Sequence, residues 1–216
     1  MAIEQSEIQE EYAEVSGISF EEYLVKYNSV EGVKTEWTPS GVESYTMSNN
    51  LTHQSILKFL LGLLDFYLTQ YQLGQVLPAG FPMYFDKKQP AREPDLLVVL
   101  NEHTGRIQRT RLVGAADIAV EIVSPESDDR DHGRKFVEYE AARIPEYWLI
   151  DPLRRIADIH ILDDEGRYQR NPLDTQGRLQ STVLPGFRFD PLLLWQAKLP
   201  GGPALVALID QMQESR

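Results

Sequence analysis

The sequence predicts an α/β fold in which a mixed sheet lies between helices. A long helix is expected first, because apolar residues recur at helical spacing between Leu51 and Tyr71. Several short apolar runs follow it, and a second helix is expected among them over residues 128–142. Runs that are apolar on both faces indicate buried strands, so this order of elements favours a mixed sheet flanked by helices.

The remaining elements follow from local signals. Ser19 is a candidate N-cap for a short helix over Phe20–Tyr27, since two glutamates in the first turn suit the helix dipole. Residues 36–47 alternate around a Pro-Ser-Gly turn and predict a hairpin. The segment Gly74–Gly80 interrupts the helical spacing of apolar residues that precedes it. Short strands are expected over residues 83–85, 95–100, 106–112, 117–123, 146–150 and 156–162.

Composition excludes several classes of site. The 216 residues suffice for one domain with a buried core, and the absence of cysteine excludes disulfides, thiolate zinc sites and cysteine nucleophiles. The four histidines do not have the spacing of a zinc site. A net charge of −12 counts against extensive contact with nucleic-acid phosphates, although a local basic patch can lie on an acidic protein. Arg106, Arg109 and Arg111 form one candidate patch.

The sequence also predicts how the chain is organised. Its first residues contain no basic segment followed by an apolar one, and the most apolar window, Ile56–Leu68, is interrupted by two charged residues. We therefore expect no signal peptide and no membrane span, and a cytoplasmic protein. A domain is expected over residues 18–195, after a loose acidic arm over residues 1–17. Residues 196–216 are expected to pack on this domain or on a dimer partner.

Three polar residues occur where a buried core disfavours them. Asp95 opens an apolar run, Glu121 lies within a second run, and Lys135 lies on the helix that follows. An unpaired buried carboxylate is costly, and two carboxylates on adjacent strands avoid this cost by binding a divalent cation. Mg²⁺ prefers oxygen ligands, so we expect it at these two acids and the Ile122 carbonyl, with Mn²⁺ as a possible substitute.

Such a metal site predicts phosphodiester hydrolysis, assisted by a lysine that orients water or stabilises charge. This chemistry on a sheet commonly uses Pro-Asp followed by (Asp/Glu)-x-Lys. Pro94-Asp95 matches the first part, but Val123 stands where the lysine belongs. One face of the predicted helix carries polar residues at three- and four-residue spacing, so Lys135 is expected to supply the amine. The residues expected on this face are Asp128, Asp131, Lys135 and Tyr139.

An ordered set of segments between residues 18 and 195 then indicates a family. The segments are Glu36-Trp37 with Gly41-Val42-Glu43 and Met47, His53, Glu93-Pro94-Asp95, Glu121-Ile-Val-Ser124-Pro125, Asp131 with Lys135 and Tyr139, and Pro145-Glu-Tyr-Trp-Leu-Ile-Asp-Pro152. Together they resemble the Uma-two family of putative restriction endonucleases, within the PD-(D/E)XK nuclease superfamily. The resemblance implies a restriction-endonuclease-like α/β/α core and a magnesium-dependent nuclease site at Asp95, Glu121 and Lys135, in which the relocated lysine is a family feature.

Each candidate residue also has a structural interpretation. Asp95 can instead close a turn, Glu121 can form a buried ion pair with an arginine, and Lys135 can be a solvated residue paired with Asp131. Other polar residues are candidates for supporting the metal or contacting substrate, or alternatively for capping and surface positions. These candidates are Glu36, Glu43, His53, Ser124, Asp131 and Tyr139.

The expected function is that of a magnesium-dependent endodeoxyribonuclease acting on DNA. A homodimer is expected because cleavage of both strands uses two sites related by a two-fold axis. An alternative is a non-catalytic relative that binds nucleic acid or protein, which the acidic charge and Val123 favour. Hydrolysis of a different phosphoester is a third possibility, because metal and carboxylates alone do not define a DNA substrate.

Overall fold

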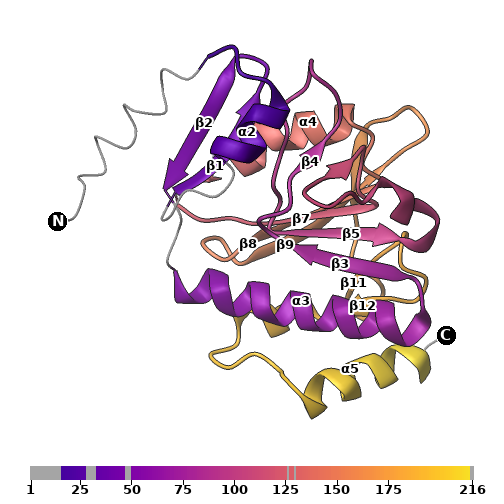
Figure 1. Ribbon diagram of the computed structural model, residues 1–216. Helices are drawn as coiled ribbons and strands as arrows, with labels where there is room; N and C mark the ends of the chain where they lie inside the picture. Colours follow the sequence, from indigo (N-terminus) through magenta and orange to yellow (C-terminus); the bar gives the residue numbers. More distant parts are fainter. Residues whose placement is uncertain (1–15, 28–32, 47–49, 126, 129, 215–216) are drawn as a thin grey trace.

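A six-stranded mixed sheet forms the centre of the computed structural model, which describes residues 16–27, 33–46, 50–125, 127–128 and 130–214 (Figure 1). The strands have the order β10-β9-β8-β7-β5-β3. Their bounds are β3 (Gly74–Pro78), β5 (Leu96–Leu100), β7 (Ile118–Ile122), β8 (Glu146–Asp151), β9 (Ile156–Leu162) and β10 (Tyr168–Asn171). The helices are α2 (Phe20–Lys26), α3 (Leu51–Tyr71), α4 (Lys135–Ala141) and α5 (Pro203–Glu214). The predicted α/β fold with a mixed central sheet flanked by helices is confirmed.

β7 and β8 run parallel, whereas the other neighbouring pairs of this sheet are antiparallel. Parallel strands need a crossover connection, and here it contains a π-helical turn, η2 (Arg130–Arg134), followed directly by α4. The helix predicted over residues 128–142 is therefore shorter than expected and begins in a π-helical turn.

Alternate residues of the central strands face two different layers. Val98 and Val120 pack toward α3 and α5 on one face of the sheet. Val99 and Ala119 belong to the opposite face, where Tyr139 of α4 joins the same apolar cluster. This alternation follows from the two-residue period of a strand, and it determines which polar residues can meet beneath α4.

The C-terminal part of the chain packs on the same domain. Ile209 and Met212 of α5 are buried in the cluster that includes α3, and Figure 1 shows α5 lying along α3. Leu194, in the 3₁₀ turn η3 (Pro191–Trp195), is buried in that cluster as well. Residues 196–216, expected to pack on this domain or on a dimer partner, thus supply core residues to their own domain through α5.

A small N-terminal unit lies near α4, outside the six-stranded sheet (Figure 1). It consists of α2 and the hairpin of β1 (Val33–Thr38) and β2 (Gly41–Thr46). Ser19 caps α2 by accepting the Glu22 amide, as predicted. Phe20, Tyr23 and Trp37 form the core of the unit. The expected acidic arm, up to residue 15, and Met47 lie outside the described residues.

Two expectations about strands were wrong. Gly74–Gly80 contains an edge strand, β3, paired with β5. Glycine suits this position because a Cβ at Gly74 would lie 2.2 Å from the Val99 carbonyl oxygen. The strand predicted over residues 106–112 is reduced to the two-residue strand β6 (Leu112–Val113), because Arg106 belongs to a 3₁₀ turn, η1 (Asn101–Arg106), and the Gln108 amide bonds the Arg111 carbonyl in a tight turn.

Two short strand pairs complete the described structure. β4 (Met83–Tyr84) pairs in parallel with β6 (Leu112–Val113), and β11 (Leu179–Gln180) pairs antiparallel with β12 (Arg188–Phe189). None of the helices within the described ranges is both long enough and apolar enough to cross a membrane.

Candidate active site

Two acidic residues reach the same end of neighbouring strands. β5 and β7 are antiparallel with Leu96 opposite Val120, and this register continued by one residue places Asp95 opposite Glu121. Strand alternation turns Glu121 toward the α4 layer. Asp95 Oδ2 accepts a hydrogen bond of 2.7 Å from the Ile122 amide, next to Glu121. Sheet geometry therefore brings the two carboxylates together.

Lys135 reaches Glu121 from the start of α4. Its Nζ donates to Glu121 Oε1 at 2.6 Å, and Tyr139 OH donates to the same oxygen at 2.7 Å. Asp131 Oδ1 lies 3.3 Å from the lysine nitrogen. The side chains of Lys135 and Glu121 are only 1% and 2% exposed. Lys135 is thus an enclosed residue, not the solvated lysine of the alternative interpretation.

The charges of this cluster are strongly coupled. Burial raises the pKa of Glu121 to about 7; attraction by Lys135 opposes the shift, and repulsion by Asp131 and Asp95 adds to it. Burial alone would lower the pKa of the Lys135 amine, but the surrounding carboxylates outweigh burial and raise that pKa. The amine therefore stays charged, while Glu121 carries repulsion that a further cation would relieve.

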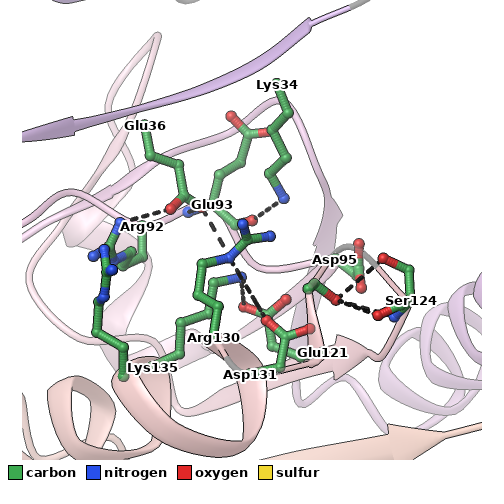
Figure 2. Close-up of polar contacts among 12 residues, drawn as sticks. Lys34, Glu36, Arg92, Glu93, Asp95, Glu121, Ser124, Arg130, Asp131 and Lys135 are labelled. Atoms are coloured by element: carbon green, nitrogen blue, oxygen red, sulfur yellow. Dashed lines mark hydrogen bonds and ion pairs between the residues drawn. The ribbon is translucent and has the colours of Figure 1, made fainter. Parts of the chain in front are cut away.

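Glu36 enters the site from strand β1. Its Oε1 accepts the Glu93 amide at 3.2 Å and lies 4.0 Å from Lys135 Nζ, while its Oε2 accepts from Arg92 Nη1 at 2.7 Å (Figure 2). Burial would raise the pKa of Glu36, but Lys135 and Arg92 outweigh burial and lower that pKa to about 2. Glu36 is therefore a charged group that joins the N-terminal hairpin to the layer of α4.

Arg92 is the centre of a second cluster next to the first. Its guanidinium binds Glu36 and Glu43 of the hairpin and forms two hydrogen bonds, of 2.6 and 2.9 Å, with Glu138 of α4. Glu43 also accepts from Arg134 at 2.9 Å. Its carboxylate is thus held by two arginines, which leaves Glu36 as the hairpin acid that approaches Lys135.

His53 and Ser124 occupy different positions relative to Asp95. His53 Nε2 lies 3.3 Å from Asp95 Oδ2, so the first turn of α3 reaches the acid. Burial would lower the pKa of His53, but the bond to Asp95 outweighs burial and raises it. Ser124, by contrast, bonds Ser127 through its amide and hydroxyl. This pair shapes the turn after β7, and among the described residues Ser124 bonds neither acid.

Comparison with known proteins places this geometry in a family. A model of the Uma2 family, described as "Putative restriction endonuclease", matches residues 20–193. The chain belongs to the Uma2 family. No curated protein sequence matches this Uma2 protein. A solved structure described as a putative nuclease belonging to DUF820, from Anabaena variabilis ATCC 29413, has a similar fold, with a TM-score of 0.65 at 14% identity, covering 83% of this chain and 98% of that chain. Family and fold together support a nuclease.

The carboxylates of this Uma2 protein fit a hard divalent cation. Glu121 uses Oε1 for its bonds to Lys135 and Tyr139, and Asp95 uses Oδ2 for its bonds to His53 and Ile122. Within the described parts of the chain, the second oxygen of each acid accepts no hydrogen bond. Two such carboxylate oxygens suit Mg²⁺, which keeps several of its waters. The Ile122 amide is engaged with Asp95, and its carbonyl stays the predicted third ligand.

A second group of possible metal ligands is already neutralised. Asp128, His132 and Asp151 place three ligand atoms within 4.8 Å of one another. Arg154, however, binds Asp128 at 2.7 and 2.8 Å and Asp151 at 2.7 Å. A guanidinium thus compensates both acids. Asp128 belongs to this cluster, so the prediction that it shares the face of Asp131 was wrong, because Arg154 binds its carboxylate at the end of β8.

Sequence reasoning missed two cations beside the site. The first is Arg92, whose only signal is its position directly before Glu93-Pro94-Asp95. The second is Lys34 of β1, whose Nζ donates to the Glu93 carbonyl at 2.6 Å. Nothing in its local sequence distinguishes Lys34, because its partner lies 59 residues away.

Two of the three arginines predicted to form a basic patch, Arg106 and Arg111, make structural contacts instead. Arg106 donates to the Ala115 carbonyl at 2.7 Å. Arg111 binds Glu21 at 3.1 Å and lies over the ring of Phe20, 5.4 Å from its centroid. Arg106 therefore links the end of η1 to the segment before β7, and Arg111 links the segment before β6 to α2.

Proposed function

We propose that this Uma2 protein is a magnesium-dependent endodeoxyribonuclease. The observation that carries the proposal is the meeting of Asp95 and Glu121 at one end of β5 and β7, with Lys135 Nζ 2.6 Å from Glu121. Two carboxylates and an amine suit the hydrolysis of a phosphodiester in a site that binds a divalent ion. Mn²⁺ takes similar ligands and is expected to substitute for Mg²⁺.

Each residue has a distinct role in this proposal. Asp95, Glu121 and the Ile122 carbonyl would hold the ion, which lowers the pKa of bound water and offsets negative charge. Lys135 orients the attacking water or stabilises charge on the phosphate. In this role it replaces the lysine that the common motif has at the position of Val123. Tyr139 fixes the orientation of Glu121 through its 2.7 Å bond.

Supporting contacts fix the geometry of the proposed site. His53 and the Ile122 amide hold one oxygen of Asp95, which leaves its other oxygen available to an ion. Asp131, 3.3 Å from the lysine nitrogen, adds to the attraction by which Glu121 keeps this amine charged. Outer contacts of this kind set the orientation of metal ligands, so their loss is expected to weaken metal binding and activity together.

Cleavage of duplex DNA in Mg²⁺ and in EDTA tests the proposal. Asp95→Asn, Glu121→Gln and Lys135→Met are each expected to lower the cleavage rate by at least about a hundredfold. Asp65→Asn on the exposed face of α3 is the matched control and should cleave like the wild type. Full activity of Glu121→Gln, or wild-type cleavage unaffected by EDTA, would contradict the assignment.

A non-catalytic binding module is the second candidate function. The observation that favours it is the enclosed Lys135–Glu121 pair, in which lysine supplies the positive charge without any metal. Calorimetry with Mn²⁺ distinguishes the two functions. A nuclease site should bind the ion with an affinity that depends on Asp95 and Glu121, whereas a binding module should show no such dependence.

We also propose a homodimer, because cutting both strands of a duplex suits two sites related by a two-fold axis. Leu192 and Val206 are 67% and 38% exposed, and they are the apolar side chains near the C-terminal elements that a partner could cover. Analytical ultracentrifugation tests this, and a monomer at all concentrations would oppose it.

A further inference from the structure

Lys34 extends its amine from the hairpin into the site. Figure 2 shows the side chain descending from β1 toward Glu93, on the same side as Asp95. Its Nζ bonds the Glu93 carbonyl at 2.6 Å. The Glu93 carboxylate turns elsewhere, because its Oε1 accepts the Gly80 amide at 2.7 Å. Lys34 therefore binds a neutral carbonyl. This carbonyl lies near the start of β5 and the end of β7, where Asp95 and Glu121 are found.

The two lysines of the site differ in what surrounds them. Lys135 is buried and lies within 4.0 Å of three carboxylates, those of Glu121, Asp131 and Glu36. Lys34 is only partly buried, and within the described parts of the chain no carboxylate oxygen lies within ion-pair distance of its Nζ. An ammonium has three N–H groups, and the Glu93 carbonyl occupies one. The carboxylates around Lys135 engage its charge and its N–H donors. Lys34 keeps its charge and further N–H donors for a ligand.

The amine of Lys34 lies next to the candidate metal ligands. Its Nζ bonds the carbonyl of Glu93, which directly precedes Pro94-Asp95 in the chain. Glu36 follows Lys34 by two residues on the same strand, so both side chains leave the same face of β1, and Glu36 Oε1 accepts the Glu93 amide. The two hairpin side chains therefore meet the same residue, two positions before Asp95.

We propose that Lys34 is the phosphate-binding residue of this site, which contacts the nucleic-acid backbone while Lys135 stays at Glu121. The inference rests on the proposed nuclease function and names the contact through which that site holds its substrate. A lysine ammonium is a compact point charge suited to a phosphate oxygen. A local cation is needed here, because a chain of net charge −12 otherwise repels a polyanion.

Binding of a fluorescent DNA duplex tests the inference when cleavage is disabled by Glu121→Gln in every protein used. In this background, Lys34→Gln is expected to weaken binding roughly fivefold or more and to reduce the salt slope of binding by about one, measured by anisotropy from about 50 to about 200 mM salt. Lys34→Arg keeps the charge and should bind within about twofold of its parent.

Lys26→Gln on α2 is the matched control, since it removes the same charge from the same N-terminal unit. Lys26 already pairs with Glu22 at 2.7 Å, so its loss should change neither affinity nor salt slope. Identical behaviour of Lys34→Gln and Lys26→Gln would overturn the role of Lys34. Absence of both cleavage and DNA binding in the unaltered protein would instead overturn the proposed function, and the inference with it.

A second measurement needs no substitution at Lys34 and holds even if Lys34→Gln fails to fold. Acetylation of surface amines, quantified by mass spectrometry with and without the duplex, should show Lys34 protected several-fold by DNA, while Lys26 stays equally reactive. Equal labelling of Lys34 in both conditions would overturn the inference.

Discussion

Lys135 Nζ and Glu121 Oε1 lie 2.6 Å apart, and neither side chain is appreciably exposed. Together with the bond from Tyr139 to the same oxygen, the pair joins α4 to β7 of the central sheet. Buried ion pairs of this kind contribute little net stability as a pair, yet removal of one partner leaves the other charge uncompensated. Stability measurements can therefore test the site separately from catalysis.

Lys135→Met is expected to destabilise the protein by about 3–5 kcal/mol, because Glu121 and Asp131 lose their shared cation in a buried place. Urea unfolding in EDTA measures the change. Lys58→Met on the exposed side of α3 should shift stability by no more than about 0.5 kcal/mol. The double variant with Glu121→Gln should recover part of the loss, and a strictly additive double variant would show that the two side chains are not coupled.

Arg92→Met should destabilise the protein by about 3–5 kcal/mol, since it leaves Glu36 without its closest cation and separates the hairpin from Glu138. Arg134→Met is the comparison, because Arg134 also binds Glu43 but is 54% exposed, and its loss should cost less than about 1 kcal/mol. Chemical denaturation compares them, and equal effects would contradict the central position of Arg92.

Gly74→Ala should destabilise the edge of the sheet by about 1–3 kcal/mol or more, because the added methyl would lie 2.2 Å from the Val99 carbonyl oxygen. Hydrogen exchange should show faster exchange of the β3 amides. Gly105→Ala is the control, as a Cβ there meets no atom within 4 Å. If both variants melted alike, the close approach of β3 and β5 would be wrong.

His160 should make the protein less stable in acid than a variant that lacks this histidine. Burial lowers the pKa of this histidine below its usual 6.5, so the unfolded chain binds the proton more readily than the folded one. As pH drops below 6.5, the free energy of unfolding of the wild type should decrease relative to that of His160→Gln; the raised pKa values of Glu121 and His53 act in the opposite sense but are common to both proteins. Unfolding from about pH 7 to about pH 5 measures this, and parallel profiles would exclude the effect.

Much of the arrangement could be read from short-range patterns. Strand alternation turned Glu121 away from the α3 layer, and helical spacing put Lys135 on the face of Tyr139. Both inferences need only the period of one element. The same reasoning failed at Asp128, because its partner Arg154 lies 26 residues away and helical spacing carries no signal for that pairing.

Contacts between distant segments could not be predicted. Lys34 meets Glu93 across 59 residues, and Arg92 meets Glu36 across 56 residues. No periodic pattern specifies which strand of a separate hairpin will lie over which end of a sheet. β3 was missed for a different reason: glycine usually interrupts a strand, yet at Gly74 its missing side chain is what lets two backbones approach.

The N-terminal hairpin contributes no strand to the six-stranded sheet, yet it supplies Glu36 and Lys34 to the candidate site at one end of that sheet. A shortened chain that started at α3 would still contain all six strands and much of the hydrophobic interior. It would nevertheless lack both of these side chains and remove the carboxylates of Glu36 and Glu43 from Arg92. The central sheet and the complete set of site residues consequently require different lengths of this polypeptide.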